Sequence, residues 1–383
     1  MRQFITTLLL LLMMTPCLMA QKKELSQARS SIKSGKYADA EKVLTALLKD
    51  STNRTNKRIW LAYYDAVLGQ YEQGNEKLYL KQQYDTASFF AKALQMLTIA
   101  ETLDSLTPEN RKSHSHQLNI LRPNIFNGGS FLVRKNKWAE AYRYYEAYLD
   151  CARQPLFQAY HYDSIDARMP EAAYWATYCG YKMKDAVLTL RHSKRALQDA
   201  TKADFTLQFI AEARKWLNDD ELYVQTLEEG FRRFPQFHYF FPRLMDAYNE
   251  TGQDEKALAL ADSALAVNPS SELFLFAKST TLLKLERFAE SIKYSDRLIE
   301  VNPNLAEPYF NAGTAYVNIA DRLSEKNEKK LMKQAYQKAC PYMEHYRQLM
   351  PNEQAKWAPV LYRIYLNLNM GKQFDEIDQL LKK

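Results

Sequence analysis

Few side chains in this sequence have the types and spacing that catalysis or metal binding requires. His114 and His116 are two residues apart, which places them on different faces of a helix and disfavours a shared metal ion. His161 stands just before Asp163 and Asp166 in an acidic stretch. Acidic residues between helices are usually solvated, so we expect no active site there. A hydrolase that uses this acidic stretch is the enzymatic alternative.

Motifs for phosphate, zinc and acyl-transfer chemistry are missing from the sequence. It contains no glycine-rich phosphate loop, no His-Glu-x-x-His helix and no Gly-x-Ser-x-Gly turn. The double glycine in Asn127-Gly128-Gly129-Ser130 falls where two helices are expected to cross closely, so we interpret it as a packing feature. We therefore predict no catalytic residues, no metal, no cofactor and no enzymatic activity.

The N-terminal residues 1–20 have the pattern of a cleaved export signal. A short positive start leads into an apolar run from Phe4 to Met14, and a more polar exit ends at the small residue Ala20. The run is too short to span a bilayer. Lipid attachment at Cys17 is the alternative, although the proline before it fits poorly. We expect a periplasmic or envelope-associated soluble protein, cleaved near Ala20.

The charge of the mature chain bears on its partners, and its cysteines bear on whether it forms disulfides. Removing the signal lowers the net charge from +7 to +6, and the charges are interleaved, which disfavours nucleic acid and anionic membranes as partners. Cys151, Cys179 and Cys340 remain, far apart and in apolar helical contexts. We expect buried free thiols.

The composition favours an all-helical fold. The 383 residues are 46% apolar and 25% charged, and they include only 10 Gly and 13 Pro against 26 Tyr and 18 Phe. These are too few turn residues for many short strands.

A fixed period of 34 residues organises the second half of the chain. Pro235, Pro269 and Pro303 recur at this interval, each after a helical pattern. In the same frame, mostly small residues recur that would let helices approach closely: Thr177, Ala211, Met245, Ser279 and Gly313, and also Ala196, Gly230 and Ala264. The period indicates stacked helical hairpins.

The unit from His238 to Ser271 resembles the tetratricopeptide repeat (TPR). The resemblance rests on Phe241, Leu244, Met245, Tyr248, Gly252, Ala257, Leu258, Ala261, Ala264, Leu265 and Pro269. Arg214 and Tyr223 depart from the pattern in a weaker unit. The resemblance implies an all-α, right-handed superhelical solenoid of antiparallel hairpins.

The frame also predicts the domain organisation. After the signal at 1–20, residues 21–169 are expected to form irregular TPR-like hairpins, with an undefined register at 55–121 and an inserted loop from Leu156 to Arg168. A regular array should cover 170–351, its last unit having two long helices, and a degenerate hairpin at 352–383 with its turn at Gly371 should cap the stack.

In the TPR family, the first helix of each hairpin lines a concave groove that binds a protein or peptide. Carried over by position, the resemblance places this binding stripe at Tyr174, Tyr178, Tyr181, Gln208, Glu212, Tyr239, Asp246, Asn249, Phe276, Thr280, Phe310 and Thr314. The expected function is that of an exported, non-enzymatic scaffold or adaptor for a protein or peptide partner. The sequence gives neither the identity of this partner nor the oligomeric state. An exported glycan-binding repeat protein that stacks sugars on Tyr and Trp is the alternative.

Overall fold

The computed structural model describes residues 21–382, in which the regular structure is entirely helical. The signal expected at 1–20 lies outside the described residues. Contacts between helices divide the chain into two compact units, one ending at Asp220 and the other beginning at Glu221. The expected all-α class is confirmed.

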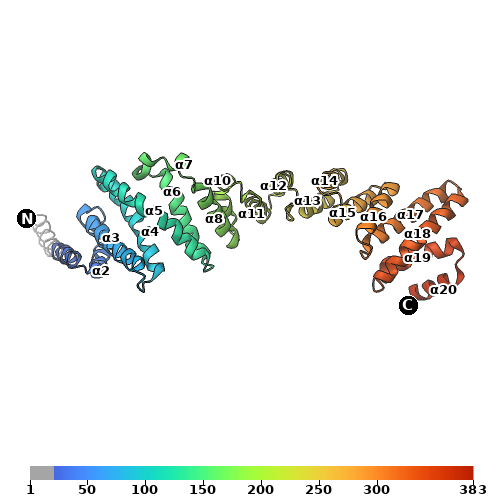
Figure 1. Ribbon diagram of the computed structural model, residues 1–383, viewed down its shortest axis with the longest axis horizontal. Coiled ribbons are helices and arrows are strands. Elements are labelled where there is room, and N and C mark those ends of the chain that lie inside the picture. The colour runs from blue at the N-terminus through green and yellow to red at the C-terminus, as the bar shows by residue number, and fades with distance from the viewer. Residues whose placement is uncertain (1–20, 383) are drawn as a thin grey trace, which may run out of the picture. The chain divides into compact units, whose positions relative to one another are not determined.

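The first unit is a series of helical hairpins. Residues 21–33 are helical, and most of the later helices pack against the next helix in the chain, whereas α6 packs directly against α8 (Figure 1). The helices are α2 (Tyr37–Leu47), α3 (Lys57–Tyr79), α4 (Thr86–Leu106), α5 (Arg111–Val133), α6 (Trp138–Asp150), α7 (Tyr162–Ile165), α8 (Met169–Lys182), α9 (Ala186–Arg191), α10 (Ser193–Ala196) and α11 (Ala203–Trp216), with 3-10 turns η1 (Ser51–Asn53), η2 (Pro108–Asn110), η3 (Cys151–Arg153) and η4 (Pro155–Tyr160).

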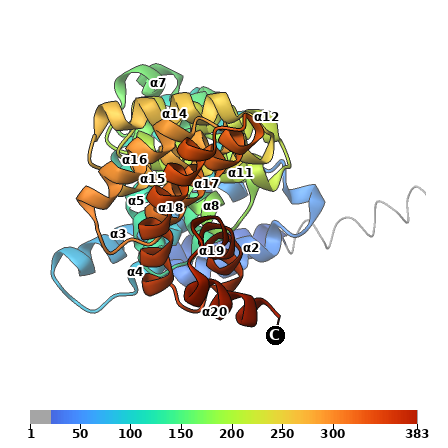
Figure 2. The same cartoon turned by 90° about the vertical axis from the view of Figure 1, so that its right-hand side faces the viewer.

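The second unit continues the hairpins with a more regular spacing. Its helices are α12 (Asp220–Arg233), α13 (Phe240–Glu250), α14 (Asp254–Val267), α15 (Glu272–Lys284), α16 (Phe288–Val301), α17 (Glu307–Glu325), α18 (Lys329–Leu349), α19 (Gln354–Leu368) and α20 (Gly371–Leu381). At 19 and 21 residues, α17 and α18 are both lengthened, as expected, and they lie side by side (Figure 2).

A residue with left-handed backbone closes the turn within each hairpin. Lys184, Asn218, Gly252 and Glu286 recur every 34 residues with φ between 54° and 66°. Asn and Gly tolerate this conformation better than other residues. In the last hairpin the reversal uses Asn369, with φ of 55°, and helix α20 already begins at the next glycine. The expectation that Gly371 forms this turn is therefore wrong.

The structure defines the register of residues 55–121. Helices α3 and α4 form one long hairpin, because Lys81 adopts φ of 55° and Asp85 caps α4 by accepting a hydrogen bond from the Ala87 amide at 3.0 Å. The Thr107 hydroxyl donates to the Leu103 carbonyl at 2.8 Å at the end of α4 and makes no capping hydrogen bond to η2, which follows it.

Small residues allow the close helix crossings that the period predicted. Ala211, Ser279 and Ala264 are fully buried. A Cβ atom on Gly128 would lie 2.6 Å from the Tyr144 ring, and one on Gly129 would lie 2.8 Å from the Tyr145 ring. Both distances are far inside van der Waals contact, which confirms that the double glycine serves packing.

Candidate functional site

The two histidines of α5 do not form a site. His114 is buried with its ring 5.1 Å from that of Tyr64, whereas His116 is exposed. Burial lowers the pKa of His114, which keeps this imidazole neutral. Within residues 21–382, no group of three or more His, Cys, Asp or Glu side chains is arranged to hold a metal ion.

The acidic stretch before α8 is tied to a buried arginine. Arg122 of α5 lies between the rings of Tyr148 and Tyr162, with its guanidinium carbon 3.6 and 3.8 Å from their centroids. It donates to Asp166 at 2.6 Å, and the Tyr148 hydroxyl donates to the same oxygen at 2.7 Å. Burial opposes ionisation of Asp166, but these hydrogen bonds hold its pKa below the ordinary value. The expectation of a simply solvated loop is wrong for Asp166, although Asp163 is exposed.

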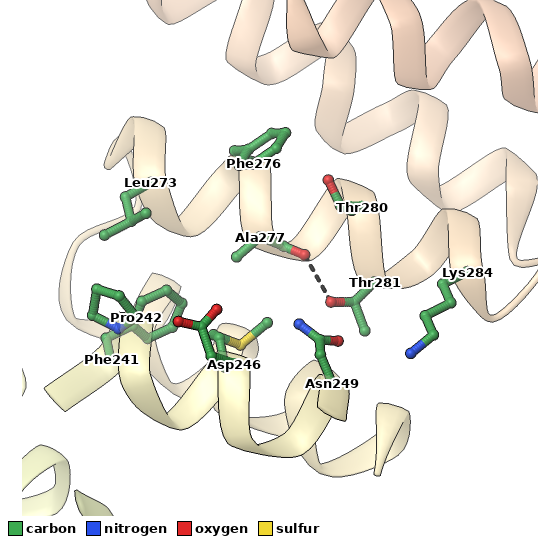
Figure 3. A pocket seen from close by; sticks show the side chains of 11 residues that line it. Phe241, Pro242, Asp246, Asn249, Leu273, Phe276, Ala277, Thr280, Thr281 and Lys284 are labelled. Carbon is green, nitrogen blue, oxygen red and sulfur yellow. Dashed lines mark hydrogen bonds between the residues drawn. The ribbon is translucent and has the colours of Figure 1, made fainter. Parts of the chain in front are cut away.

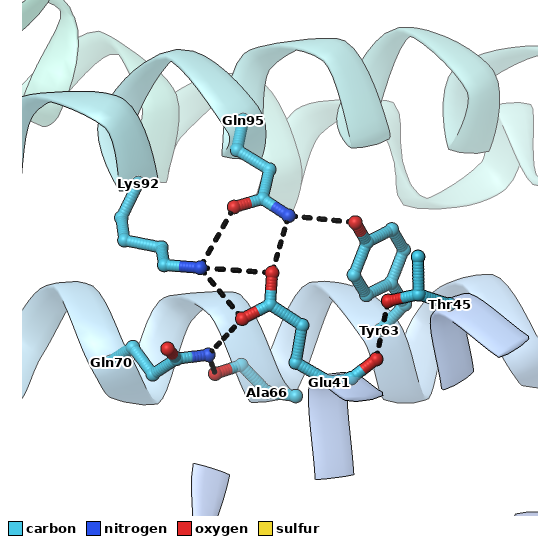
Figure 4. A network of polar contacts seen from close by, with 7 residues as sticks. All are labelled: Glu41, Thr45, Tyr63, Ala66, Gln70, Lys92 and Gln95. Atoms are coloured by element: carbon cyan, nitrogen blue, oxygen red, sulfur yellow. Dashed lines mark hydrogen bonds and ion pairs between the residues drawn. The ribbon is translucent and has the colours of Figure 1, made fainter. Parts of the chain in front are cut away.

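A second polar cluster links α2, α3 and α4 (Figure 4). The Glu41 carboxylate accepts hydrogen bonds from Lys92 at 2.6 and 2.9 Å, from Gln95 at 2.6 Å and from Gln70 at 2.7 Å. Burial opposes its ionisation, but the bonds from Lys92, Gln70 and Gln95 hold the pKa of Glu41 below the ordinary value. A carboxylate with this many donors is unsuited to act as a proton donor near neutral pH. The cluster therefore serves to join three helices.

The cysteines match the expectation of buried free thiols. Cys151, Cys179 and Cys340 are all buried and unpaired. Burial raises the pKa of each thiol to about 12. At neutral pH these thiols stay protonated and are therefore poor nucleophiles.

The first-unit part of the binding stripe is largely filled by aromatic packing. Tyr174 is only 8% exposed, because Tyr178 stacks on it and Phe209 of α11 packs against it with a centroid distance of 6.0 Å. Tyr181 stacks on Phe209 at 4.5 Å and on Trp216 at 5.8 Å. The stripe residues Gln208 and Glu212, also on α11, are half-buried. These tyrosines offer little open surface to a partner.

The second-unit part of the stripe opens into a pocket between α13 and α15 (Figure 3). Four stripe residues line it: Asp246 and Asn249 on α13, and Phe276 and Thr280 on α15. The pocket has a volume of about 190 Å³. This is slightly more than a cavity that holds one benzene ring and less than a typical drug-sized site, so it suits a single bulky side chain.

Aromatic packing fixes the two helices that form this pocket. The ring centroids of Phe241 on α13 and Phe274 on α15 lie 4.6 Å apart, and Phe241 also lines the pocket. Ser271 caps α15 by accepting a hydrogen bond from the Phe274 amide at 3.4 Å. On the side facing α17, the Asn311 amide donates to the hydroxyls of Ser279 and Thr280, both at 3.0 Å. The position of α15 is thus set from both neighbouring hairpins.

The pocket is mostly apolar with an acidic edge. Asp246 and Asn249 project from α13 toward α15, and neither side chain forms a hydrogen bond or ion pair with another residue in the described part of the chain (Figure 3). Lys284, at the end of α15, is paired with Asp254 at 2.5 Å. Asp246 is therefore the charge in the lining that lacks compensation.

The other stripe residues of this unit are covered to different degrees. Tyr239 is 7% exposed, with the Arg243 guanidinium 3.9 Å above its ring. Phe310 is half-buried and packs 5.0 Å from Tyr346, and Thr314 is half-buried. Tyr239 therefore contributes little open surface.

Several pocket residues were absent from the sequence-based set of stripe residues. They are Phe241, Pro242, Met245, Ala277, Thr281 and Lys284. Extending the stripe by one helical step would have found Pro242, four residues before Asp246, and Lys284, four residues after Thr280.

The hairpins and their 34-residue spacing give the chain a TPR-like architecture. No family model matches the chain. A solved C-terminal part of a TPR repeat-containing protein from Cytophaga hutchinsonii is similar, with 15% identity, a TM-score of 0.43 and coverage of 66% of this chain and 92% of that one. MamA protein is similar at 13% identity, with a TM-score of 0.36 and coverage of 50% and 96%. The apo form of RapI is similar at 14%, with a TM-score of 0.36 and coverage of 94% and 98%. Among the helices of residues 21–382, none is both long and apolar enough to cross a membrane.

Proposed function

We propose that this chain is an exported, non-enzymatic scaffold that binds a protein or peptide partner through the pocket between α13 and α15. The observation that carries the proposal is the coincidence of this pocket with Asp246, Asn249, Phe276 and Thr280 of the predicted stripe. The volume and the apolar lining suit one side chain of an extended peptide, held at its edges by polar groups.

The packing of the first-unit aromatics supports a peptide rather than a glycan as the partner. Sugars stack on a flat aromatic face that is open to solvent. Tyr178 instead meets Trp138 and Trp175 edge to face, at interplanar angles of 90° and 84°. Tyr181 has its ring stacked between Phe209 and Trp216. Other aromatic side chains of the same unit thus pack against both tyrosines.

A peptide selection tests the pocket. Residues 21–383 would be immobilised, peptides selected from a random phage-displayed library, and the enriched peptides synthesised for measurement of Kd by fluorescence polarisation. We expect Phe276→Ser to weaken binding by at least about tenfold, because aromatic anchors in a desolvated pocket commonly carry this much affinity.

A matched control separates binding from folding. Leu331 of α18 is 46% exposed and lies outside the pocket, so Leu331→Ser removes a similar apolar surface without touching the site. Both variants should keep the helicity and melting temperature of the parent. Equal binding by the parent and Phe276→Ser would reject the pocket as the binding site.

Export has its own measurement. N-terminal sequencing of the protein purified from the envelope fraction should give a start near Gln21. An intact Met1, or a lipid on Cys17, would contradict a soluble exported form.

A further inference from the structure

We infer that the pocket between α13 and α15 recognises a peptide segment in which a bulky apolar side chain lies next to a lysine or arginine. The inference rests on the proposed function and adds the chemical class of the partner. It depends on the pocket's lining and on the distribution of charge around it.

The apolar half of this recognition comes from the pocket floor. Phe241, Met245, Leu273 and Phe276 supply carbon surface from both helices. Phe241 and Met245 are buried by their neighbours, whereas Leu273 is 44% exposed at the pocket's end. An aliphatic or aromatic side chain that entered would cover this exposed carbon and displace water from it.

The charged half comes from the imbalance between Asp246 and Lys284. Lys284 already has the Asp254 carboxylate 2.5 Å away, and so its charge is satisfied within the chain. The second lysine of α15, Lys278, is buried. Its ammonium group donates a hydrogen bond to the Asp262 carboxylate, and the Nζ atom lies 3.9 Å from the centroid of the Tyr294 ring. Asp246 is exposed and has no such partner. An incoming cation can therefore pair with Asp246 without displacing an existing contact.

The polar groups beside Asp246 suit the backbone of an extended peptide. The Asn249 amide carries both donors and an acceptor, and it lies one helical turn from Asp246 on the same face of α13. Thr280 also lines the pocket from α15, and although its hydroxyl accepts a hydrogen bond from Asn311, it keeps its own proton to donate. The pocket can thus bind a peptide backbone next to the apolar side chain and the cation.

Selections on two charge-reversed variants test the inference. Asp246→Lys reverses the charge of the pocket, and Glu300→Lys makes the same change in net charge at an exposed position of α16 outside it. With the parent and with Glu300→Lys, we expect peptides whose binding depends on Phe276 to be enriched in Lys or Arg within a few residues of an apolar side chain. With Asp246→Lys, we expect Asp or Glu at that place.

Measurements of Kd for individual selected peptides test the role of Asp246 directly. For a selected peptide, Asp246→Asn should raise Kd about fivefold at low salt, and the effect should vanish when the peptide's cation is replaced by Ala. Peptides that depend on Phe276 but show no cation preference would overturn this inference and leave the proposed function standing. Failure to select any peptide that depends on Phe276 would overturn both.

Discussion

Helices α8 and α15 occupy corresponding positions in their hairpins, yet one is covered and the other is open. On α8 the stripe consists of Tyr174, Tyr178 and Tyr181, which pack on one another and on Phe209. On α15 the corresponding stripe has one aromatic, Phe276, followed by Thr280, and the facing α13 offers Asp246 and Asn249. Large rings on both helices fill the space between them, whereas small and polar side chains leave a pocket. The residue type at these positions therefore decides whether a stripe becomes core or surface.

The two units also differ in how they hold polar groups. The first unit holds a half-buried polar cluster around Glu41, a second cluster around the buried Arg122, and two buried histidines whose pKa values are lowered. In the second unit the charged pairs are mostly at the surface, such as Arg287 with Glu290 at 2.8 Å. Buried pairs constrain geometry strongly, whereas exposed pairs contribute little to stability. The irregular first unit thus depends on specific side chains more than the regular second unit does.

The largest expected effect follows from removing the arginine that anchors the inserted segment. Arg122→Met keeps the volume but leaves Asp166 partly buried without its cation and ends the contacts with two tyrosine rings. We expect the first unit to lose about 3–5 kcal/mol of stability, as when one partner of a buried ion pair is removed. Hydrogen exchange measured by mass spectrometry should become faster in α5 and in residues 151–168, and stay unchanged in α14 to α16.

Arg122→Lys serves as its control. Lysine keeps the charge but lacks the planar fork that bonds Asp166 and stacks between the rings, so exchange should lie between the parent and Arg122→Met. Unchanged exchange in residues 151–168 for both variants would show that the segment is held by its own packing.

The sequence predicted the framework better than these anchors. The 34-residue period correctly identified buried small residues such as Ala264 and Ala211, because close helix crossings recur with the repeat. It did not identify the Arg122 or Glu41 clusters, whose partners are separated by 26 to 54 residues and follow no period. It also did not separate filled from open stripe positions, because Tyr174 is buried by Phe209, a residue of another hairpin.

The second effect is a dependence of first-unit stability on pH. His192 is 7% exposed, and burial lowers its pKa from 6.5 to about 4. The unfolded chain therefore binds a proton between these values that the folded chain does not, and stability present above pH 6.5 is lost as the pH falls toward 4. The expected loss is about 3 kcal/mol. Urea unfolding followed by tryptophan fluorescence reports it, since four of the five tryptophans precede Asp220.

His192→Gln tests the assignment of this pH dependence. The variant cannot take up a proton, so its stability should change much less between pH 6.5 and 4.5, a window that lies above the lowered pKa values of Glu41 and Asp166. A small dependence of the free energy of unfolding on pH should remain, because burial also lowers the pKa of His114. A pH dependence equal to that of the parent would assign the effect to other groups.

The smallest effect compares one turn in each unit. Gly252 and Lys184 hold corresponding turns with φ of 66° and 56°. A Cβ atom at Gly252 would meet no other atom within 4 Å, so Gly252→Ala adds no clash and its cost is the left-handed backbone alone, about 1 kcal/mol. Lys184→Gly should stay within roughly 0.5 kcal/mol of the parent, because relief of backbone strain offsets the greater freedom of the unfolded glycine. Hydrogen exchange in the hairpins α13–α14 and α8–α9 measures both changes. If Gly252→Ala and Lys184→Gly changed the stability of their hairpins by the same amount, the strain in these turns would be set by the surrounding hairpin and not by the turn residue.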